Sequence, residues 1–366
     1  MEYYLQKKKI IKNREMRNFT FKGLFLAIVF IVLGSLSIQA ADGLITKQIT
    51  IKLEKAGTLP DKIGSTKKFQ ITNLKIIGEI NGTDLRMIRE MAGNDAWGDK
   101  TNGMLSVLDL SDAKIVEGGD SYDDDNGYHY YFTSNDKIGD YAFYGCSGLT
   151  SLTLPSGVTE IGSSAFEDCS GLTSLTLPSG VTSIGNHAFD GCSVLTSLTL
   201  PSGVTEIGDF VFWGCSGLTS ITLPSGVTEI GEGAFASCSG LTSITLPSGV
   251  TEIGARAFSG CSGLTSIYVY TEKLPKVGRD VFDGCDAKKC TVYVPKGTYD
   301  DYWLSEFGYF ENIVEFDPTG INNVITSNDA KELSRYSLNG QRLSAPTKGL
   351  NIVKYSDGSV KKVVVR

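Results

Sequence analysis

The chain has 366 residues, of which 41% are apolar, and its mean hydropathy is −0.02. This composition supports a packed core and argues against a chain dominated by disorder. The formal net charge is −7, which makes nucleic acid and anionic membrane surfaces poor partners.

The first 40 residues are typical of an export signal peptide. Basic residues precede a 12-residue apolar run, GLFLAIVFIVLG (23–34), and SLSIQA then offers small residues for cleavage after Ala40. The run is shorter than the roughly 20 residues that a membrane span needs, so we expect cleavage and no integral membrane protein. Cleavage would remove seven Lys and Arg and two Glu, and leave a net charge of −12.

Residues 41–136 are expected to form an N-terminal cap with irregular first repeats. They contain a strand-spaced apolar set, an apolar helical face and an L-x-x-L-x-L segment. These sets are Ile71, Leu74 and Ile76; Leu85, Ile88 and Met91; and Leu105, Leu108 and Leu110. The acidic segment 118–132 lacks the spacing of a calcium loop, so we interpret it as a solvated insertion.

Residues 137–284 repeat a 23-residue unit seven times, I-G-x-x-A-F-x-x-C-S-x-L-T-S-L-T-L-P-S-G-V-T-E. The alternation in TSLTL predicts a short strand with one buried face, and PSG predicts a turn. The AF pair is expected in a turn or short helical stretch on the opposite side, with Phe inside. The phenylalanines and cysteines that recur every 23 residues are Phe143, Phe166, Phe189, Phe212, Phe235 and Phe258, and Cys146, Cys169, Cys192, Cys215, Cys238 and Cys261; Phe282 and Cys285 follow at 24.

One such coil cannot be stable alone. Burying its apolar side chains yields roughly 1.5–3 kcal/mol each, whereas ordering each residue costs about 1.5 kcal/mol. The coils must therefore stack, strand on strand, at about 4.8 Å. The fold class that we predict is a leucine-rich-repeat solenoid with one short parallel β-strand per coil, plus turns and short helical segments, followed by a small β C-terminal module.

Residues 285–316 are expected to form a C-terminal cap. The aromatic and apolar side chains expected to close the core there are Trp303, Phe307, Phe310 and Ile313. Residues 317–366 are interpreted as a linker and a small β module, because Asn339-Gly340 and Asp357-Gly358 are hairpin turn signals.

The unit IGxxAFxxCSxLTSLTLPSGVT resembles the BspA-type leucine-rich repeats of bacterial surface proteins. The resemblance covers residues 138–316 closely, and residues 51–135 resemble the N-terminal cap of such proteins. The tail resembles C-terminal β modules of secreted bacterial proteins, some of which are sorting signals. The resemblance implies a secreted or surface-exposed protein that binds host or bacterial partners, in some members matrix proteins.

The cysteine ladder is interpreted as a row of free buried thiols. Equivalent positions in a parallel stack point the same way, and cysteine is among the most buried residue types. Cys285 and Cys290 lie in CDAKKC, which departs from the repeat, so a disulfide between them is a second possibility that export permits.

Catalytic patterns are missing, since the chain has no HExxH, GxSxG or P-loop motif. His187 stands at a repeat position that also holds Ser164, Phe210 and Gly233, which indicates a tolerant surface site. His129 has no nucleophile beside it in the sequence. We predict no enzyme, no cofactor and no metal.

Two surfaces are candidates for binding. The strand side carries a monotonous row of threonines that ends in tyrosines, and the variable side carries aromatic residues where other coils have small or polar ones. The candidate residues are Thr153, Thr176, Thr199, Thr222, Thr245, Tyr268 and Tyr270 on the first, and Phe210 and Trp213 on the second.

The function that we predict is an exported, adhesin-like binding protein, secreted or on the cell surface, which recognises host matrix proteins or proteins of other cells. The alternative is a glycan-binding module that uses the Ser/Thr strand side with Tyr268 and Tyr270. A glycan array separates the two, because strong hits without binding to matrix proteins favour the alternative.

Deleting residues 320–366 is predicted to change the localisation of the protein and to leave the repeats folded. Cell fractionation and thermal unfolding of the deletion variant test this. A sharp fall in the unfolding temperature of the repeats would make the tail a structural cap instead.

Overall fold

The computed structural model describes residues 43–317, apart from 125, 126 and 128, and residues 332–337, 342–343, 345, 348–355 and 360–365. The predicted signal peptide and most of the linker lie outside these residues. The chain divides into two compact units, Met1–Thr46 and Lys47–Arg366, and the repeats lie in the second. Within the described residues, we find no helix with the length and apolarity to cross a membrane.

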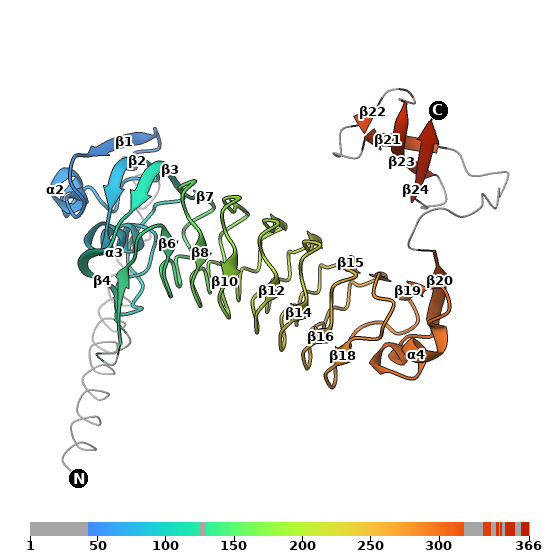
Figure 1. The fold of residues 1–366 in the computed structure, drawn as a ribbon. Helices are drawn as coiled ribbons and strands as arrows, with labels where there is room; N and C mark the ends of the chain where they lie inside the picture. Colours follow the sequence, from blue (N-terminus) through green and yellow to red (C-terminus); the bar gives the residue numbers. More distant parts are fainter. Residues whose placement is uncertain are drawn as a thin grey trace, which may run out of the picture. The chain divides into compact units, whose positions relative to one another are not determined.

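The repeats form the predicted solenoid, in which successive coils contribute short parallel strands side by side (Figure 1). The strands from the TSLTL segments and the caps make two sheets: β1 (Ile49–Leu53), β2 (Asn73–Ile80), β3 (Val107–Ile115), β7 (Ser151–Thr153) and β9 (Ser174–Thr176); and β11 (Ser197–Thr199), β13 (Ser220–Thr222), β15 (Ser243–Leu246), β17 (Ser266–Val269), β19 (Thr291–Pro295) and β20 (Asn312–Phe316). We call the outer side of these strands the strand face.

A second set of two-residue strands follows the PSG turns. These strands are β6 (Lys137–Ile138), β8 (Glu160–Ile161) and β10 (Ser183–Ile184); and β12 (Glu206–Ile207), β14 (Glu229–Ile230), β16 (Glu252–Ile253) and β18 (Lys276–Val277). After each of them the chain turns through the AF segment. We call the outer side of these turns the turn face: residues 139–146, 162–169, 185–192, 208–215, 231–238, 254–261 and 278–285.

Residues one repeat apart pair directly. Leu152 pairs with Leu175, and Leu198 pairs with Ile221, so that each inward side chain lies above its own copy. Just before each strand the later coil donates, as in Thr173 N to Thr150 O. In the AF turns the earlier coil donates, as in Phe166 N to Ala188 O, whereas the glycine that precedes the turn donates back, as in Gly162 N to Ile138 O. Both sides of a coil therefore satisfy backbone groups through their neighbours.

The phenylalanines form one continuous buried stack. Neighbouring rings from Phe143 to Phe282 lie nearly parallel, with centroids 5.2 to 5.9 Å apart. All seven are at most 1% exposed. The predicted inward Phe is thus confirmed, and its ring bridges from coil to coil.

The cysteine ladder is buried and consists of free thiols. From Cys169 onward, each Sγ of the ladder donates to the carbonyl oxygen of a phenylalanine in the preceding coil, for example Cys238 Sγ to Phe212 O at 3.1 Å. Cys285 keeps this contact, with Sγ 3.3 Å from Phe258 O, so the expectation that it leaves the repeat frame is wrong. Burial raises the pKa of the Cys146 thiol to about 11 and that of Cys238 to about 12.

The N-terminal cap contains α2 (Leu59–Ile63), α3 (Gly82–Met91) and the hairpin β4 (Gly118–Asp124) and β5 (Tyr130–Thr133). Helix α3 begins with a capping box, in which Asn81 accepts from Thr83 N and Asp84 accepts from Asn81 N. Its apolar face buries Leu85, Ile88 and Met91, as their spacing predicts.

Segment 118–132 is partly structural rather than only a solvated insertion. Asp123 lies 3.1 Å from the fully buried guanidinium of Arg89, which also donates to the carbonyl oxygens of Asp95 and Tyr141. Because an unpaired buried charge is costly, this ion pair fixes the hairpin against α3.

The C-terminal cap contains α4 (Tyr299–Trp303) and the 3₁₀ helix η1 (Glu306–Tyr309). Phe307 and Phe310 are fully buried and contact Phe282, the last ring of the stack. Trp303, expected in the core, is 45% exposed, because α4 turns Tyr302 inward instead and the Tyr302 hydroxyl bonds to Thr271.

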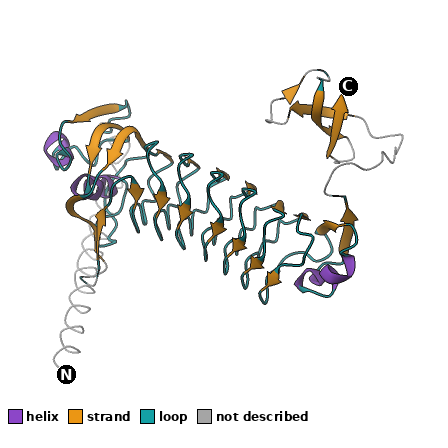
Figure 2. Cartoon of the chain, in the orientation of Figure 1, coloured by secondary structure: helices purple, strands orange, loops and turns teal. Residues whose placement is uncertain are grey.

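The described helices lie in the caps, whereas the repeats consist of short strands and loops (Figure 2). The tail, described by itself, is an antiparallel sheet in the order β22-β21-β23-β24. Its strands are β21 (Glu332–Ser337), β22 (Arg342–Leu343), β23 (Gly349–Tyr355) and β24 (Val360–Val365).

Each turn of the turn face places two residues in the left-handed backbone region. The second of them, just before each Cys, is usually glycine, as at Gly214 with φ of 68° and Gly260 with φ of 73°. Ser237 occupies this position with φ of 62° and carries the steric cost of a side chain there.

Replacing Ser237 by Gly is predicted to raise the free energy of unfolding by up to about 1 kcal/mol, because glycine adopts this conformation without strain. The matched control is Ser239→Gly two residues later, where φ is not positive and the added chain entropy should cost about 0.5 kcal/mol. Denaturant unfolding of both variants measures the two changes in the free energy of unfolding. Changes of the same sign in the two variants would contradict the assignment of strain to Ser237.

The buried thiols predict a loss of stability at alkaline pH. Between the ordinary pKa of 9.0 and the folded value of about 12, Cys238 keeps its proton only in the folded state. The unfolded state is therefore favoured as pH rises through this window, by about 1.4 kcal/mol per pH unit for one thiol. The destabilisation caused by Cys238→Ala should be about 1.4 kcal/mol smaller at pH 10 than at pH 8.

Urea unfolding at the two pH values checks this prediction. Thr245→Ala removes an exposed hydroxyl and no titratable group, so its effect should not change with pH. A pH-independent effect of Cys238→Ala would mean that the thiol ionises as easily in the folded protein.

Candidate functional site

The strand face carries the predicted polar row. Its side chains all point outward from the centres of successive strands and are exposed: Thr153, Thr176, Thr199, Thr222 and Thr245. Tyr268 continues the row and stacks on Tyr293 of the next coil, with ring centroids 4.6 Å apart and planes 7° apart. Tyr270 contacts Phe316 edge to face at 5.2 Å.

A second row of threonines has a structural role that the sequence did not reveal. The hydroxyl of Thr173 donates to Thr150 O at 2.9 Å, and that of Thr242 donates to Thr219 O at 3.2 Å. These hydroxyls reinforce the backbone bonds between coils at the start of each strand. The outward row named above has no such described bond to a neighbouring coil.

The turn face carries the two predicted aromatic residues. Phe210 is half-buried and stacks on the imidazole of His187, with centroids 4.9 Å apart and planes 18° apart. Trp213 is 47% exposed and meets Phe210 edge to face at 6.4 Å. Phe210 and His187 both have a left-handed backbone, at the position where another coil has Gly233.

More aromatic side chains lie at the N-terminal end of the same face. Tyr141 contacts Tyr131 of the hairpin at 4.8 Å and Tyr144 at 5.7 Å between ring centroids. Together with Trp97 and the carboxylates of Asp123 and Asp124, they line a cavity of about 360 Å³. The sequence pattern places Tyr141 and Tyr144 on one coil, but the hairpin and Trp97 reach them only through the fold of the cap.

Between these two aromatic groups lies a line of acidic residues. Glu167 and Asp190 occupy equivalent positions of neighbouring coils, and Asp168 is exposed next to Glu167. Burial raises the pKa of the Glu167 and Asp190 carboxyls. Burial first, and then the negative charges of Glu167, Asp168 and Asp123, raise the pKa of the Tyr144 hydroxyl.

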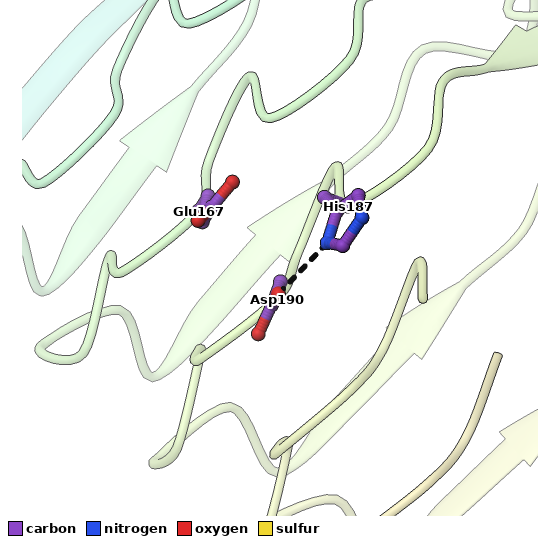
Figure 3. Close-up of side chains that lie close together, drawn as sticks. All are labelled: Glu167, His187 and Asp190. Atoms are coloured by element: carbon purple, nitrogen blue, oxygen red, sulfur yellow. Dashed lines mark hydrogen bonds and ion pairs between the residues drawn. The ribbon is translucent and has the colours of Figure 1, made fainter. Parts of the chain in front are cut away.

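His187 lies within this acidic line. Its Nδ1 is 2.9 Å from Asp190 Oδ2, and Glu167 of the preceding coil lies beside the pair (Figure 3). The sequence prediction of a tolerant surface position did not include this cluster. The sequence spacing does contain a signal for it. Asp190 lies three residues after His187 and one repeat after Glu167, which places the three side chains near one another in a stack of 23-residue coils.

We call the whole group the aromatic–acidic surface. Its residues are Trp97, Tyr131, Tyr141, Tyr144, Phe210 and Trp213, with Asp123, Asp124, Glu167, Asp168 and Asp190. It runs across four neighbouring coils of the turn face.

Cys285 and Cys290 are buried free thiols in the structure. Burial raises the pKa of both to about 12. A disulfide between them stays a prediction, and neither thiol reaches the turn face or the strand face as a binding group.

Sequence comparison identifies a repeat family. The BspA type leucine rich repeat region matches in six copies, over residues 130–240, 169–289 and 234–341. No curated protein matches the chain.

The solved structures that are similar to it include the following three. A leucine rich repeat protein of T. pallidum is 31% identical over 43% of this chain and 79% of that chain, with a TM-score of 0.34. A leucine rich cell surface protein from Faecalibacterium prausnitzii A2-165 is 38% identical over 41% of this chain and 46% of that one, with a TM-score of 0.33, so the match spans under half of that protein. A leucine-rich repeat protein from Bacteroides ovatus ATCC 8483 is 21% identical over 76% and 74%, with a TM-score of 0.39. Because the matched repeats cover more than half of the chain, the protein belongs to the BspA-type leucine-rich-repeat family.

Proposed function

We propose that the protein is exported and binds other proteins at the cell surface through the aromatic–acidic surface. Membership of the BspA-type family supports a protein-binding role, and the similar protein from F. prausnitzii is described as a cell surface protein. The partners that we propose are proteins of host matrix or of other cells. Export rests on the predicted signal peptide at residues 1–40.

The observation that carries this proposal is the gathering of exposed aromatic side chains on one face. Trp97 of the cap is 55% exposed and Trp213 of the turn face is 47% exposed. Large aromatic side chains that bury on association are the usual anchors of protein interfaces.

The negative charge of the surface restricts the class of partner protein that fits it. The carboxylates of Asp124, Glu167 and Asp168 lie among the aromatic rings. Electrostatic complementarity speeds association and excludes partners of like charge. A partner with lysine or arginine side chains therefore fits this surface better than an acidic one, and cation–π contacts with the rings would add to the attraction.

The strand face fits a partner less well. Sugars commonly stack on the open face of an aromatic ring, but Tyr293 covers one face of Tyr268. The exposed threonines offer hydroxyl groups without an aromatic platform beside most of them. Glycan binding there is the alternative that the following experiment separates.

The test compares two pairs of substitutions in the exported protein. Phe210→Gly with Trp213→Ala gives one coil the residues that another coil has at Gly233 and Ala236, so the repeat should remain folded. Loss of the two aromatic anchors should weaken binding to a captured partner about tenfold or more. Thr199→Ala with Thr222→Ala is the matched control on the strand face and should leave binding unchanged.

Partners are captured from host matrix proteins and from intact bacterial cells, and affinities are measured by surface plasmon resonance. Loss of binding in the threonine pair alone, or competition by free glycans, would contradict the proposal and favour the alternative.

A further inference from the structure

Glu167, His187 and Asp190 bring three metal-ligating groups together on the turn face. Their ligand atoms, one from each residue, all lie within 4.8 Å of one another. Figure 3 shows the Glu167 side chain on one coil and the other two on the next, with His187 joined to Asp190. The cluster combines imidazole nitrogen and carboxylate oxygen, the donors that zinc and related ions use in proteins.

The repeat stack sets the two carboxylates in parallel. Glu167 and Asp190 are equivalent residues of adjacent coils, where other coils carry Tyr144, Trp213 and Ala236. Like charges on neighbouring turns repel when no cation lies between them. Asp190 is only 7% exposed, so solvent screens its charge poorly.

The imidazole is held in place by its surroundings. Phe210 stacks on one face of the His187 ring at 4.9 Å, and Asp190 fixes the direction of Nδ1. Fixed orientation of a ligating histidine ring is a common feature of metal sites. Glu167 is longer and half-exposed, so it can move toward an ion with little change in packing.

We propose that Glu167, His187 and Asp190 bind a divalent transition-metal ion of the zinc type. Bonds of about 2.1 Å place tetrahedral ligands about 3.4 Å apart, so a rotation of Glu167 closes the longest separation in the cluster. The ion takes the place of the proton between His187 Nδ1 and Asp190 Oδ2. Three protein ligands leave a fourth position, open to water or to a group of a binding partner.

The site is independent of the proposed protein-binding role, because metal binding is measured on the protein alone. It lies in the middle of the aromatic–acidic surface, between Tyr144 and Phe210. A bound ion would therefore reduce the negative charge of that surface and offer a coordination position to a partner.

Zinc chloride is titrated into the exported protein, purified without a polyhistidine tag, and followed by isothermal calorimetry. One site is expected in the wild type. His187→Ser copies the coil that has Ser164 at the same position, so it should fold, and it should bind zinc at least about tenfold more weakly. Glu167→Gln and Asp190→Asn should also weaken binding.

The chain has two histidines, which provides a matched control. His129→Ser should bind zinc as the wild type does, and in histidine-selective NMR spectra zinc should shift the ring signals of His187 alone. No binding by the wild type, or equal binding by His187→Ser, would overturn the proposal. The buried cysteines are the same in all variants, so binding that persists throughout would place the ion elsewhere.

Discussion

Backbone pairing between residues one repeat apart is the interaction on which the rest of the structure depends. Just before each strand the later coil donates to the coil before it, as in Thr173 N to Thr150 O, and in the AF turns the earlier coil donates to the coil after it, as in Phe166 N to Ala188 O. No coil can bury enough apolar surface alone, so these bonds and the shared core must form together. Identical spacing then places Phe above Phe and Cys above Cys, in a continuous ring stack and a row of thiol-to-carbonyl bonds.

The same constraint separates the positions that must be constant from those that can vary. The buried rows repeat almost without change, because a change in the volume of one buried side chain disturbs its packing against the coils on both sides. The left-handed position of the turn face instead holds Tyr141, Ser164, His187, Phe210, Gly233, Arg256 and Asp280. Side chains there lie outside the buried rows, so they can vary without changing the volume of the core, although each non-glycine residue bears the steric cost of a left-handed backbone. The aromatic–acidic surface and the metal-ligand cluster are both built from this region, so the uniform core supports a varied outer face.

Much of this fold can be predicted from the sequence, because the 23-residue period exposes the inward positions directly. Phe212 and Cys215 are identified by recurrence alone, and α3 by the spacing of Leu85, Ile88 and Met91. The contacts of the irregular caps cannot be read this way. The pair between Arg89 and Asp123 joins segments 34 residues apart with no repeat to align them.

The candidate site is predictable only in part for a related reason. Recurrence marks Phe210 and Trp213 as unusual, but it does not say which residues converge in space. Trp97 reaches Tyr144 through the cap, and Glu167 meets His187 across two coils. The choice of Tyr302 over Trp303 for the core depends on the rotation of a five-residue helix, which composition does not determine.

The central claim is that the 23-residue coil is the unit of structure. It is tested most directly by deleting residues 216–238, which joins Cys215 to Ser239 and restores the native Cys-Ser sequence. The account predicts a folded protein with cooperative unfolding and lower stability, seen by circular dichroism and denaturant titration. Deleting residues 216–227, about half a coil, should disrupt the stack. Equal stability of the two deletions, or loss of folding in the first, would contradict the claim that in-register coils hold the protein together.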